Sequence, residues 1–169
     1  MQKEDLNAVV RYLENNQLKI VTAESCTAGL IASTLAELPG SGKWLESAFI
    51  TYSENAKIAC LGVDAETISS HGLTSEEVAR AMARGALHNA DANLGISTTG
   101  VAGPSAGDRQ EAVGTVCFAW AFKYDDGIRC FSEKTRFNGE RNQVREAAAS
   151  YALKRIQHYH DELAMQDRP

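Results

Sequence analysis

Apolar residues recur along this chain with two different spacings, and the alternation between the two predicts the order of its elements. Near the start, Leu6, Val9, Val10 and Leu13 follow helical spacing, which predicts an amphipathic helix that ends near Asn15. Short apolar runs bounded by turn residues predict the strands. The remaining predicted elements are, in order, a strand at 19–23, a helix at 27–38, a strand at 44–52, a short helix up to about 61, a helix from 74–77 onwards, a strand at 94–99, strands at 114–122 and 128–137, and a helix at 140–163.

Local signals mark several of these boundaries. Pro39-Gly40 stops the second helix, Ser53 is placed to cap the short one, and Thr74-Ser75-Glu76-Glu77 forms a capping box. The turn Tyr124-Asp125-Asp126-Gly127 joins the last two strands as a hairpin. Strands that alternate with helices and end in a hairpin predict an α/β fold. We expect three α/β/α layers around a mixed, mostly parallel sheet that ends in an antiparallel hairpin.

Composition adds limits on the class of protein. With 169 residues, 44% of them hydrophobic, the chain is expected to form a single soluble domain over 1–169 with a frayed tail at 164–169. A net charge of −5 argues against a broad nucleic-acid surface. No apolar run is long enough to cross a membrane, and the polar start is unlike a signal peptide. The four cysteines form no C-x-x-C pair, so we expect a reducing cytoplasm.

The segment Ala23-Glu24-Ser25-Cys26-Thr27-Ala28-Gly29 is the strongest candidate for chemistry. It follows the first predicted strand and leads into a helix, so Ser25 sits where helix N–H groups and the positive end of the helix dipole converge. Such a junction can bind an anion or hold a serine that attacks a carbonyl carbon. Ser25 or Thr27 can equally serve as a plain helix cap. The segment alone leaves these alternatives open.

Other reactive side chains follow the ends of other predicted strands. Tyr52 and Lys57 come after the second strand, and a loop with Gly100 and Gly103 follows the third. Functional loops of open α/β sheets gather at the carboxyl ends of the strands, so these groups can share one crevice with Ser25. The glycine loop suits an oxyanion or a phosphate, but an ordinary turn has the same composition.

Two arginines begin the last predicted helix on one face, Arg141 and Arg145. Forked guanidinium donors suit a phosphate, and a solvated basic face is the alternative.

Several common chemistries do not fit. The glycine loop does not match the dinucleotide fingerprint, and residues 37–44 fail as a phosphate-binding loop because Glu37 replaces the first glycine and Trp44 replaces the Ser/Thr. The histidines form no metal-ligand pattern and none lies near Ser25; they are His71, His88, His158 and His160. Neither a metal site nor a Ser–His–Asp triad is therefore expected.

A serine nucleophile here needs another base, and Lys57 is the candidate. At neutral pH only about one free lysine in a few thousand is unprotonated. Lowering its pKa to about 7 requires roughly 4–5 kcal/mol of selective destabilisation of the ammonium, which burial or a nearby cation can supply. The alternative is a solvated lysine on a short helix.

Eight segments recur in an order that is typical of one known family. They are 22–29, 51–57, Leu61-Gly62-Val63, His71-Gly72, 75–79, Thr99-Gly100-Val101-Ala102-Gly103-Pro104, Val113-Gly114-Thr115-Val116 and Phe137-Asn138-Gly139-Glu140-Arg141. Together they resemble the CinA C-terminal domain family over about residues 5–160. The stand-alone form of this family is a nicotinamide mononucleotide amidohydrolase.

The resemblance implies an α/β/α fold and hydrolysis of nicotinamide mononucleotide to nicotinate mononucleotide and ammonia, a step in pyridine nucleotide recycling. It implies that Ser25 is the nucleophile, Lys57 its general base, and Tyr52 an assisting group. The residues that it implies for substrate binding are Cys26, Thr27, Thr99, Gly100, Gly103, Arg141 and Arg145, where either arginine or both hold the phosphate. No metal or cofactor is implied, the partner is a small-molecule nucleotide, and a homo-oligomer, dimer or higher, is expected.

This chain departs from the family pattern at three places. Ala28 replaces the first of two glycines, residues 105–112 lack the usual paired glycines and Lys-Pro, and Glu54-Asn55 reverses the usual order. These departures leave room for a catalytically weak or silent paralogue that binds a nucleotide as a regulatory module. A third hypothesis makes Cys26 the nucleophile.

Overall fold

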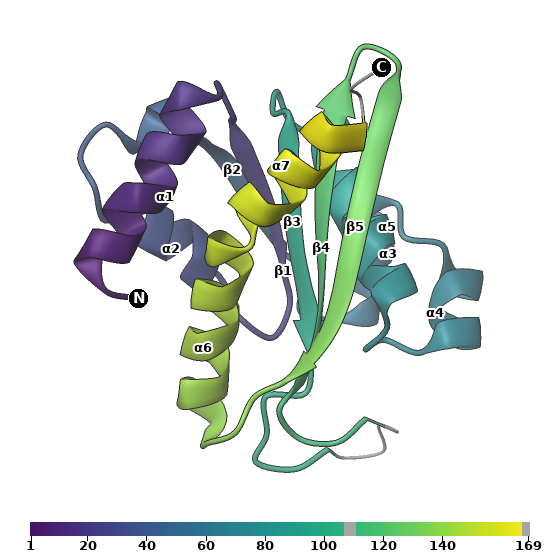
Figure 1. The fold of residues 1–169 in the computed structure, drawn as a ribbon. Coiled ribbons are helices and arrows are strands. Elements are labelled where there is room, and N and C mark those ends of the chain that lie inside the picture. Colours follow the sequence, from purple (N-terminus) through teal and green to yellow (C-terminus); the bar gives the residue numbers. More distant parts are fainter. Residues whose placement is uncertain (107–110, 167–169) are drawn as a thin grey trace.

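The computed structural model describes residues 1–106 and 111–166. Its centre is a five-stranded sheet in the order β2-β1-β3-β4-β5 (Figure 1). The strands are β1 (Ile20–Glu24), β2 (Leu45–Ile50), β3 (Leu94–Gly100), β4 (Thr115–Tyr124) and β5 (Gly127–Arg136). β1 pairs in parallel with β2 and β3, whereas β3–β4 and β4–β5 are antiparallel. The predicted mixed sheet with a terminal hairpin is confirmed.

Helices cover both faces of this sheet (Figure 1). One face carries α1 (Lys3–Asn15), α2 (Leu30–Ala36), α6 (Arg141–Lys154) and α7 (Ile156–Gln166). The other carries α3 (Glu54–Leu61), α4 (Ala65–His71) and α5 (Glu76–His88). A short 3₁₀ turn at Ser41–Lys43 precedes β2. In the described part of the chain, none of these helices has both the length and the apolar character that crossing a bilayer requires.

Strand β4 separates two hydrophobic cores because its side chains alternate between the faces. Phe118, Trp120 and neighbouring large residues pack toward α6 and α7, and Trp120 Nε1 donates to Ala152 O at 2.8 Å. Ala119 and Ala121 face α5 on the other side. Small side chains there let α5 lie close to the sheet, while the aromatic side fills the wider space under α6 and α7.

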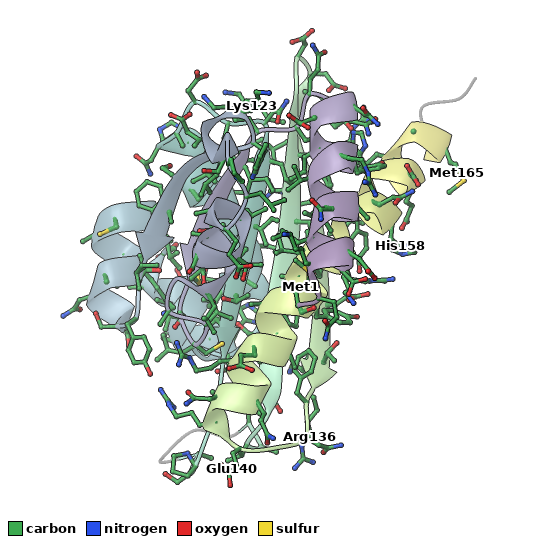
Figure 2. All side chains as sticks on the ribbon, turned by 90° about the vertical axis from the view of Figure 1, so that its left-hand side faces the viewer. Met1, Lys123, Arg136, Glu140, His158 and Met165 are labelled. Atoms are coloured by element: carbon green, nitrogen blue, oxygen red, sulfur yellow. The ribbon has the colours of Figure 1, made fainter. Side chains whose placement is uncertain are left out.

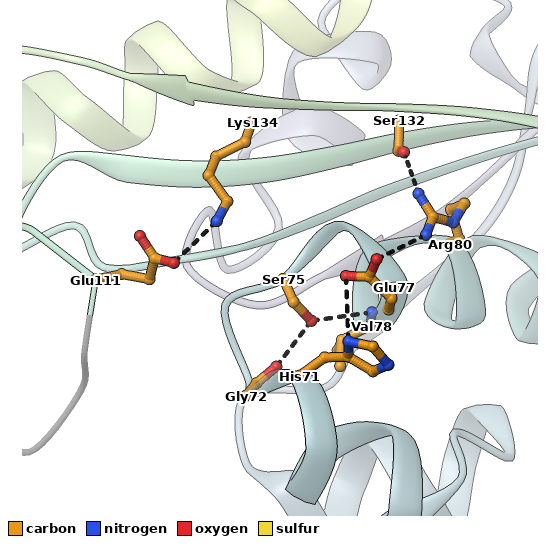
Figure 3. A network of polar contacts seen from close by, with 9 residues as sticks. All are labelled: His71, Gly72, Ser75, Glu77, Val78, Arg80, Glu111, Ser132 and Lys134. Atoms are coloured by element: carbon orange, nitrogen blue, oxygen red, sulfur yellow. Dashed lines mark hydrogen bonds and ion pairs between the residues drawn. The ribbon is translucent and has the colours of Figure 1, made fainter.

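Helix α5 is fixed at its start by a polar network (Figure 3). Ser75 caps the helix by accepting from Val78 N at 3.2 Å, and its hydroxyl donates to Gly72 O at 2.8 Å. Arg80 donates to Ser132 Oγ on β5 at 2.6 Å and to Glu77 at 3.1 Å. A helix starts here as predicted, but the predicted capping box at 74–77 is wrong, because Ser75 rather than Thr74 is the cap and Glu77 pairs with Arg80. The network ties α5 to the edge strand.

The helices differ from the sequence prediction in three places. The helix predicted at 140–163 is two helices that meet at Arg155, whose side chain pairs with Glu133 on β5 at 2.6 Å. Helix α4 was not predicted, although Asp64 caps it by accepting from Glu66 N. Helix α2 begins at Leu30 rather than at 27, because Ala28 and Gly29 adopt left-handed backbone conformations. Residues 164–166 continue α7, and 167–169 lie outside the described residues.

Packing of α3 against α5 depends on Gly85. An added Cβ at Gly85 would overlap the backbone carbonyl oxygen of Leu61, the last residue of α3. The absent side chain therefore sets how closely α3, which carries Lys57, approaches the rest of the molecule.

We expect Gly85→Ala to destabilise the protein by about 1–3 kcal/mol, since overpacking outweighs the gain of about 1 kcal/mol that alanine brings to an ordinary helix position. Urea denaturation measures the change. Gly42→Ala is the matched control, because no atom lies within 4 Å of a Cβ at that position. A stabilised Gly85→Ala variant would show that the two helices are not in contact as described.

Candidate active site

The turn after β1 carries Ser25 at the carboxyl end of the sheet. Ser25 N donates to Thr98 O on β3 at 3.0 Å, and Ala28 N donates back to Ser25 O at 3.1 Å. The chain then passes through Ala28 and Gly29, whose φ angles are 50° and 94°. The turn thus holds the Ser25 backbone at the ends of β1 and β3, and Ser25 is 7% exposed.

Glu24, the last residue of β1, is buried and accepts hydrogen bonds from the backbone N–H groups at the start of α2. Its fully buried carboxylate accepts the N–H groups of Gly29 at 2.9 Å, Ile31 at 3.2 Å and Ala32 at 3.0 Å, and the Thr22 hydroxyl at 3.2 Å. In the sequence analysis these N–H groups were candidates for binding an anion. In the structure they instead donate to the Glu24 carboxylate.

Sequence reasoning did not identify Glu24 as part of the site. The available signal was an acidic residue at the end of a strand, five positions before Gly29, in front of a helix that lacks a Ser, Thr, Asp or Asn cap.

Lys57 lies beside Ser25 although 32 positions separate them. Its Nζ is 3.0 Å from Ser25 Oγ and donates to the carbonyl oxygens of Thr51 at 2.7 Å and Tyr52 at 3.5 Å. The side chain is 1% exposed. Ser53 starts α3 by accepting from Ala56 N, which aims the first turn of this helix, and Lys57 with it, at the turn after β1.

A cavity of about 410 Å³ opens at this end of the sheet beside Ser25. Its walls come from the turn after β1, the segment between β2 and α3, the loop after β3 and the start of α6. The lining residues are Ser25, Cys26, Tyr52, Gly100, Val101, Ala102, Gly103, Ser105, Ala106 and Arg141. Figure 2 shows that Glu140, which precedes α6, and Arg136 lie at one end of the molecule, while Lys123 lies at the other.

The far side of the loop after β3 is held by β5. Glu111 pairs with Lys134 at 2.9 Å (Figure 3), and Arg136 donates to Val113 O at 3.2 Å. Residues 105–112 are one of the places where the chain differs from the family pattern. Of these, Ser105 and Ala106 line the cavity, whereas 107–110 lie outside the described residues.

The two arginines of α6 have different surroundings. Arg141 lines the cavity and donates to Gly103 O at 2.5 Å and to the Tyr52 hydroxyl at 2.7 Å. Arg145 does not belong to the cavity lining. It donates to Cys26 O and Thr27 O, each at 3.1 Å, on the turn that carries Ser25.

The hydroxyl groups of three other candidate residues each make a hydrogen bond within the protein. The Tyr52 phenol, 52% exposed, points to Arg141, so only the Tyr52 backbone carbonyl meets Lys57. Thr99 donates to Leu73 O at 2.6 Å, and Thr27 pairs with the Thr98 hydroxyl at 2.7 Å. The structure therefore places Ser25, Tyr52 and Arg141 around the cavity with Lys57 beside Ser25, and it pairs the two threonine hydroxyls with Thr98 and with the Leu73 backbone.

Cys26 also lines the cavity, but its thiol is buried. Burial raises the pKa of Cys26 to about 11, so the thiolate that a cysteine nucleophile requires is scarce at neutral pH. Among the described residues, no three His, Cys, Asp or Glu side chains gather closely enough to hold a metal ion.

Comparisons with known proteins bear on the same region. A family model described as the CinA C-terminal domain matches residues 3–160. A protein of Escherichia coli K12 named nicotinamide-nucleotide amidohydrolase PncC is 42% identical over 137 residues, which are 81% of this chain and 81% of that protein. A CinA-like protein of Chlorobium limicola is 43% identical over 156 residues, 92% of this chain. The chain spans only 36% of the length of that longer relative.

A solved structure has the same fold along nearly the whole chain. The crystal structure of a competence-damaged protein (CinA) superfamily protein from Escherichia coli superposes with a TM-score of 0.86 and 32% identity. The match covers 94% of this chain and 93% of that one.

Ala28→Gly is expected to stabilise the protein by up to about 1 kcal/mol, because a left-handed conformation costs alanine about 1–2 kcal/mol and glycine nothing, while glycine loses about 0.5–1 kcal/mol of backbone entropy. Denaturation midpoints measure this. Ala8→Gly, at an exposed position inside α1, is the matched control and should destabilise by about 1 kcal/mol. Equal losses in both variants would contradict the left-handed assignment.

The thiols should react in an order set by burial. At pH 8 an aromatic disulfide reagent should modify the exposed Cys60 rapidly and Cys26 slowly, because the pKa of Cys26 of about 11 leaves it protonated. All four thiols should titrate after unfolding. The fast phase should disappear in Cys60→Ala; its persistence there and loss in Cys26→Ala would restore the cysteine-nucleophile hypothesis.

Proposed function

The chain belongs to the CinA C-terminal domain family, and on this basis we propose that it is an amidohydrolase that converts nicotinamide mononucleotide to nicotinate mononucleotide and ammonia. The observation that carries the proposal is the 3.0 Å contact between the buried Lys57 amine and the Ser25 hydroxyl beside an open cavity. A serine paired with a base other than histidine suits amide cleavage through an acyl-enzyme. The name of the Escherichia coli relative supports the choice of substrate.

In the proposed reaction, neutral Lys57 accepts the Ser25 proton while Oγ forms a bond to the carboxamide carbon. The C–N bond of the resulting tetrahedral intermediate breaks as Lys57 returns the proton to the leaving nitrogen, so ammonia departs and an ester to Ser25 remains. Water then attacks this ester with Lys57 as base. The carboxylate product leaves and Ser25 regains its proton.

The surroundings of Lys57 suit a neutral amine. Lys57 Nζ lies within hydrogen-bond distance of Thr51 O, Tyr52 O and Ser25 Oγ, and a neutral amine there carries a lone pair that can accept the Ser25 proton. Burial at 1% exposure also disfavours the charged form. The positive charge of the pyridinium ring in the substrate would add to this effect when it binds nearby.

Arg141 is the proposed phosphate ligand. It lines the cavity, carries a planar fork of donors, and is already oriented by Gly103 O and the Tyr52 hydroxyl. Tyr52 then contributes to the mouth of the cavity and positions Arg141. Cys26, Gly100 and Gly103 contribute wall surface, while Thr27 pairs with the Thr98 hydroxyl and Thr99 with the Leu73 backbone.

The wider setting of the activity is proposed from the family alone. It is a step in pyridine nucleotide recycling that uses no metal or cofactor, carried out by a cytoplasmic homo-oligomer. The four free cysteines accord with a reducing compartment.

Purified protein should release ammonia from nicotinamide mononucleotide, and Ser25→Ala should lower kcat by about 10³-fold or more, as loss of a nucleophile does elsewhere. A coupled ammonia assay measures both. Ser69→Ala is the matched control, since this exposed serine lies on α4 and its hydroxyl donates to Glu66 O within the same helix. Tight binding of the mononucleotide without turnover in the wild type would instead support a nucleotide-binding regulatory module.

A further inference from the structure

We propose that Arg145 is a positioning residue that holds the Cys26–Thr27 backbone, and so the Ser25 hydroxyl, in its reactive place, and that it is not a ligand of the substrate phosphate. This inference rests on the proposed function, because it assigns Arg145 a part in the same reaction. It also separates the roles of two arginines that the sequence treats as equivalent.

The contacts of Arg145 all lie within the protein. Nε donates to Cys26 O at 3.1 Å and Nη2 donates to Thr27 O at 3.1 Å, while Nη1 donates to Asn142 Oδ1 at 3.1 Å. All three guanidinium nitrogens therefore have a described acceptor, two of them on the turn after β1. The carbonyls that Arg145 holds belong to the two residues directly after Ser25.

The contact with Thr27 reaches Ser25 through one peptide group. The carbonyl of Thr27 and the N–H of Ala28 belong to the same planar trans peptide and point in opposite directions. Arg145 holds the carbonyl side, and Ala28 N on the other side donates to Ser25 O at 3.1 Å. Fixing this peptide plane therefore fixes the backbone of the nucleophile.

The turn needs such support because its own conformation is unfavourable. Ala28 has a φ of 50°, a left-handed conformation that alanine rarely adopts. Glu24 stabilises the turn by accepting N–H groups on the side of α2. Arg145 supplies the complementary contacts on the side of α6, where carbonyl groups need donors.

Helix α6 is a rigid support for this contact. Its N-terminus is fixed by a capping box between Glu140 and Gln143, and Val144 and Ala148 are buried in the core. Arg145 lies between these two buried positions and is half-buried itself. Arg141, one turn earlier and exposed, is the one that reaches the cavity.

The kinetic test compares Arg145→Met, Arg141→Met and the surface control Lys154→Met on nicotinamide mononucleotide and on nicotinamide riboside, which lacks the phosphate. Arg145→Met should lower kcat about 10–100-fold with KM within about 2-fold, because Ser25 is misplaced while phosphate binding is intact. The loss should be the same on both substrates. Arg145→Lys should recover part of kcat, since one ammonium can serve one carbonyl.

Arg141→Met should behave differently, with a KM about 10–100-fold higher for the mononucleotide and no change for the riboside. Lys154 pairs with Asp5 at the far end of α6, so Lys154→Met should match the wild type. If Arg145→Met raises KM for the mononucleotide and leaves kcat unchanged, Arg145 binds phosphate and the inference is overturned.

A second measurement does not depend on turnover. Hydrogen exchange of the Ala28 amide should be about tenfold faster in Arg145→Met, whereas the amides of β3 and β4 keep their wild-type rates. Wild-type turnover with unchanged Ala28 exchange and unchanged kcat in Arg145→Met would overturn the inference alone. Faster exchange in a protein that releases no ammonia would uphold the contact and defeat the proposed function.

Discussion

The contact between Lys57 Nζ and Ser25 Oγ depends on holding two short segments, each at the end of a strand, at hydrogen-bond distance. Neither side chain could take this position in isolation: a lysine amine is strongly hydrated, and the turn at Ser25 is conformationally strained. The parallel pairing of β1 and β2 brings the ends of both strands to one edge of the sheet. From there the first turn of α3 points Lys57 back over the end of β1.

Small residues make this geometry accessible. Gly85 lets the end of α3 approach α5, and the alanines of β4 let α5 lie close to the sheet. The opposite face is packed with aromatic side chains and supports α6, from which both arginines extend. The two cores therefore position different residues, because one sets the place of Lys57 and the other sets the places of Arg141 and Arg145.

Opposite charges stabilise the two sides of the turn that carries Ser25. The Glu24 carboxylate accepts N–H groups at the start of α2, whereas the Arg145 guanidinium donates to carbonyls directly after Ser25. Each charged group matches the polarity of the backbone groups it meets. A strained turn is thus held by the surrounding structure rather than by its own preference, which is how functional sites commonly keep unfavourable backbone conformations.

The sequence by itself determined the order of strands and helices, because apolar spacing and capping residues such as Ser53 and Ser75 are local signals. It also identified Ser25, Lys57, Tyr52 and Arg141 as residues that could meet, because they follow strand ends or begin a helix. Only the tertiary structure decided what each of them contacts. Glu24 accepts the N–H groups at the start of α2, and the Thr99 hydroxyl donates to Leu73 O. Arg145 donates to the turn after β1 and does not line the cavity. Those choices depend on distances between segments remote in the chain, which no local pattern of residues encodes.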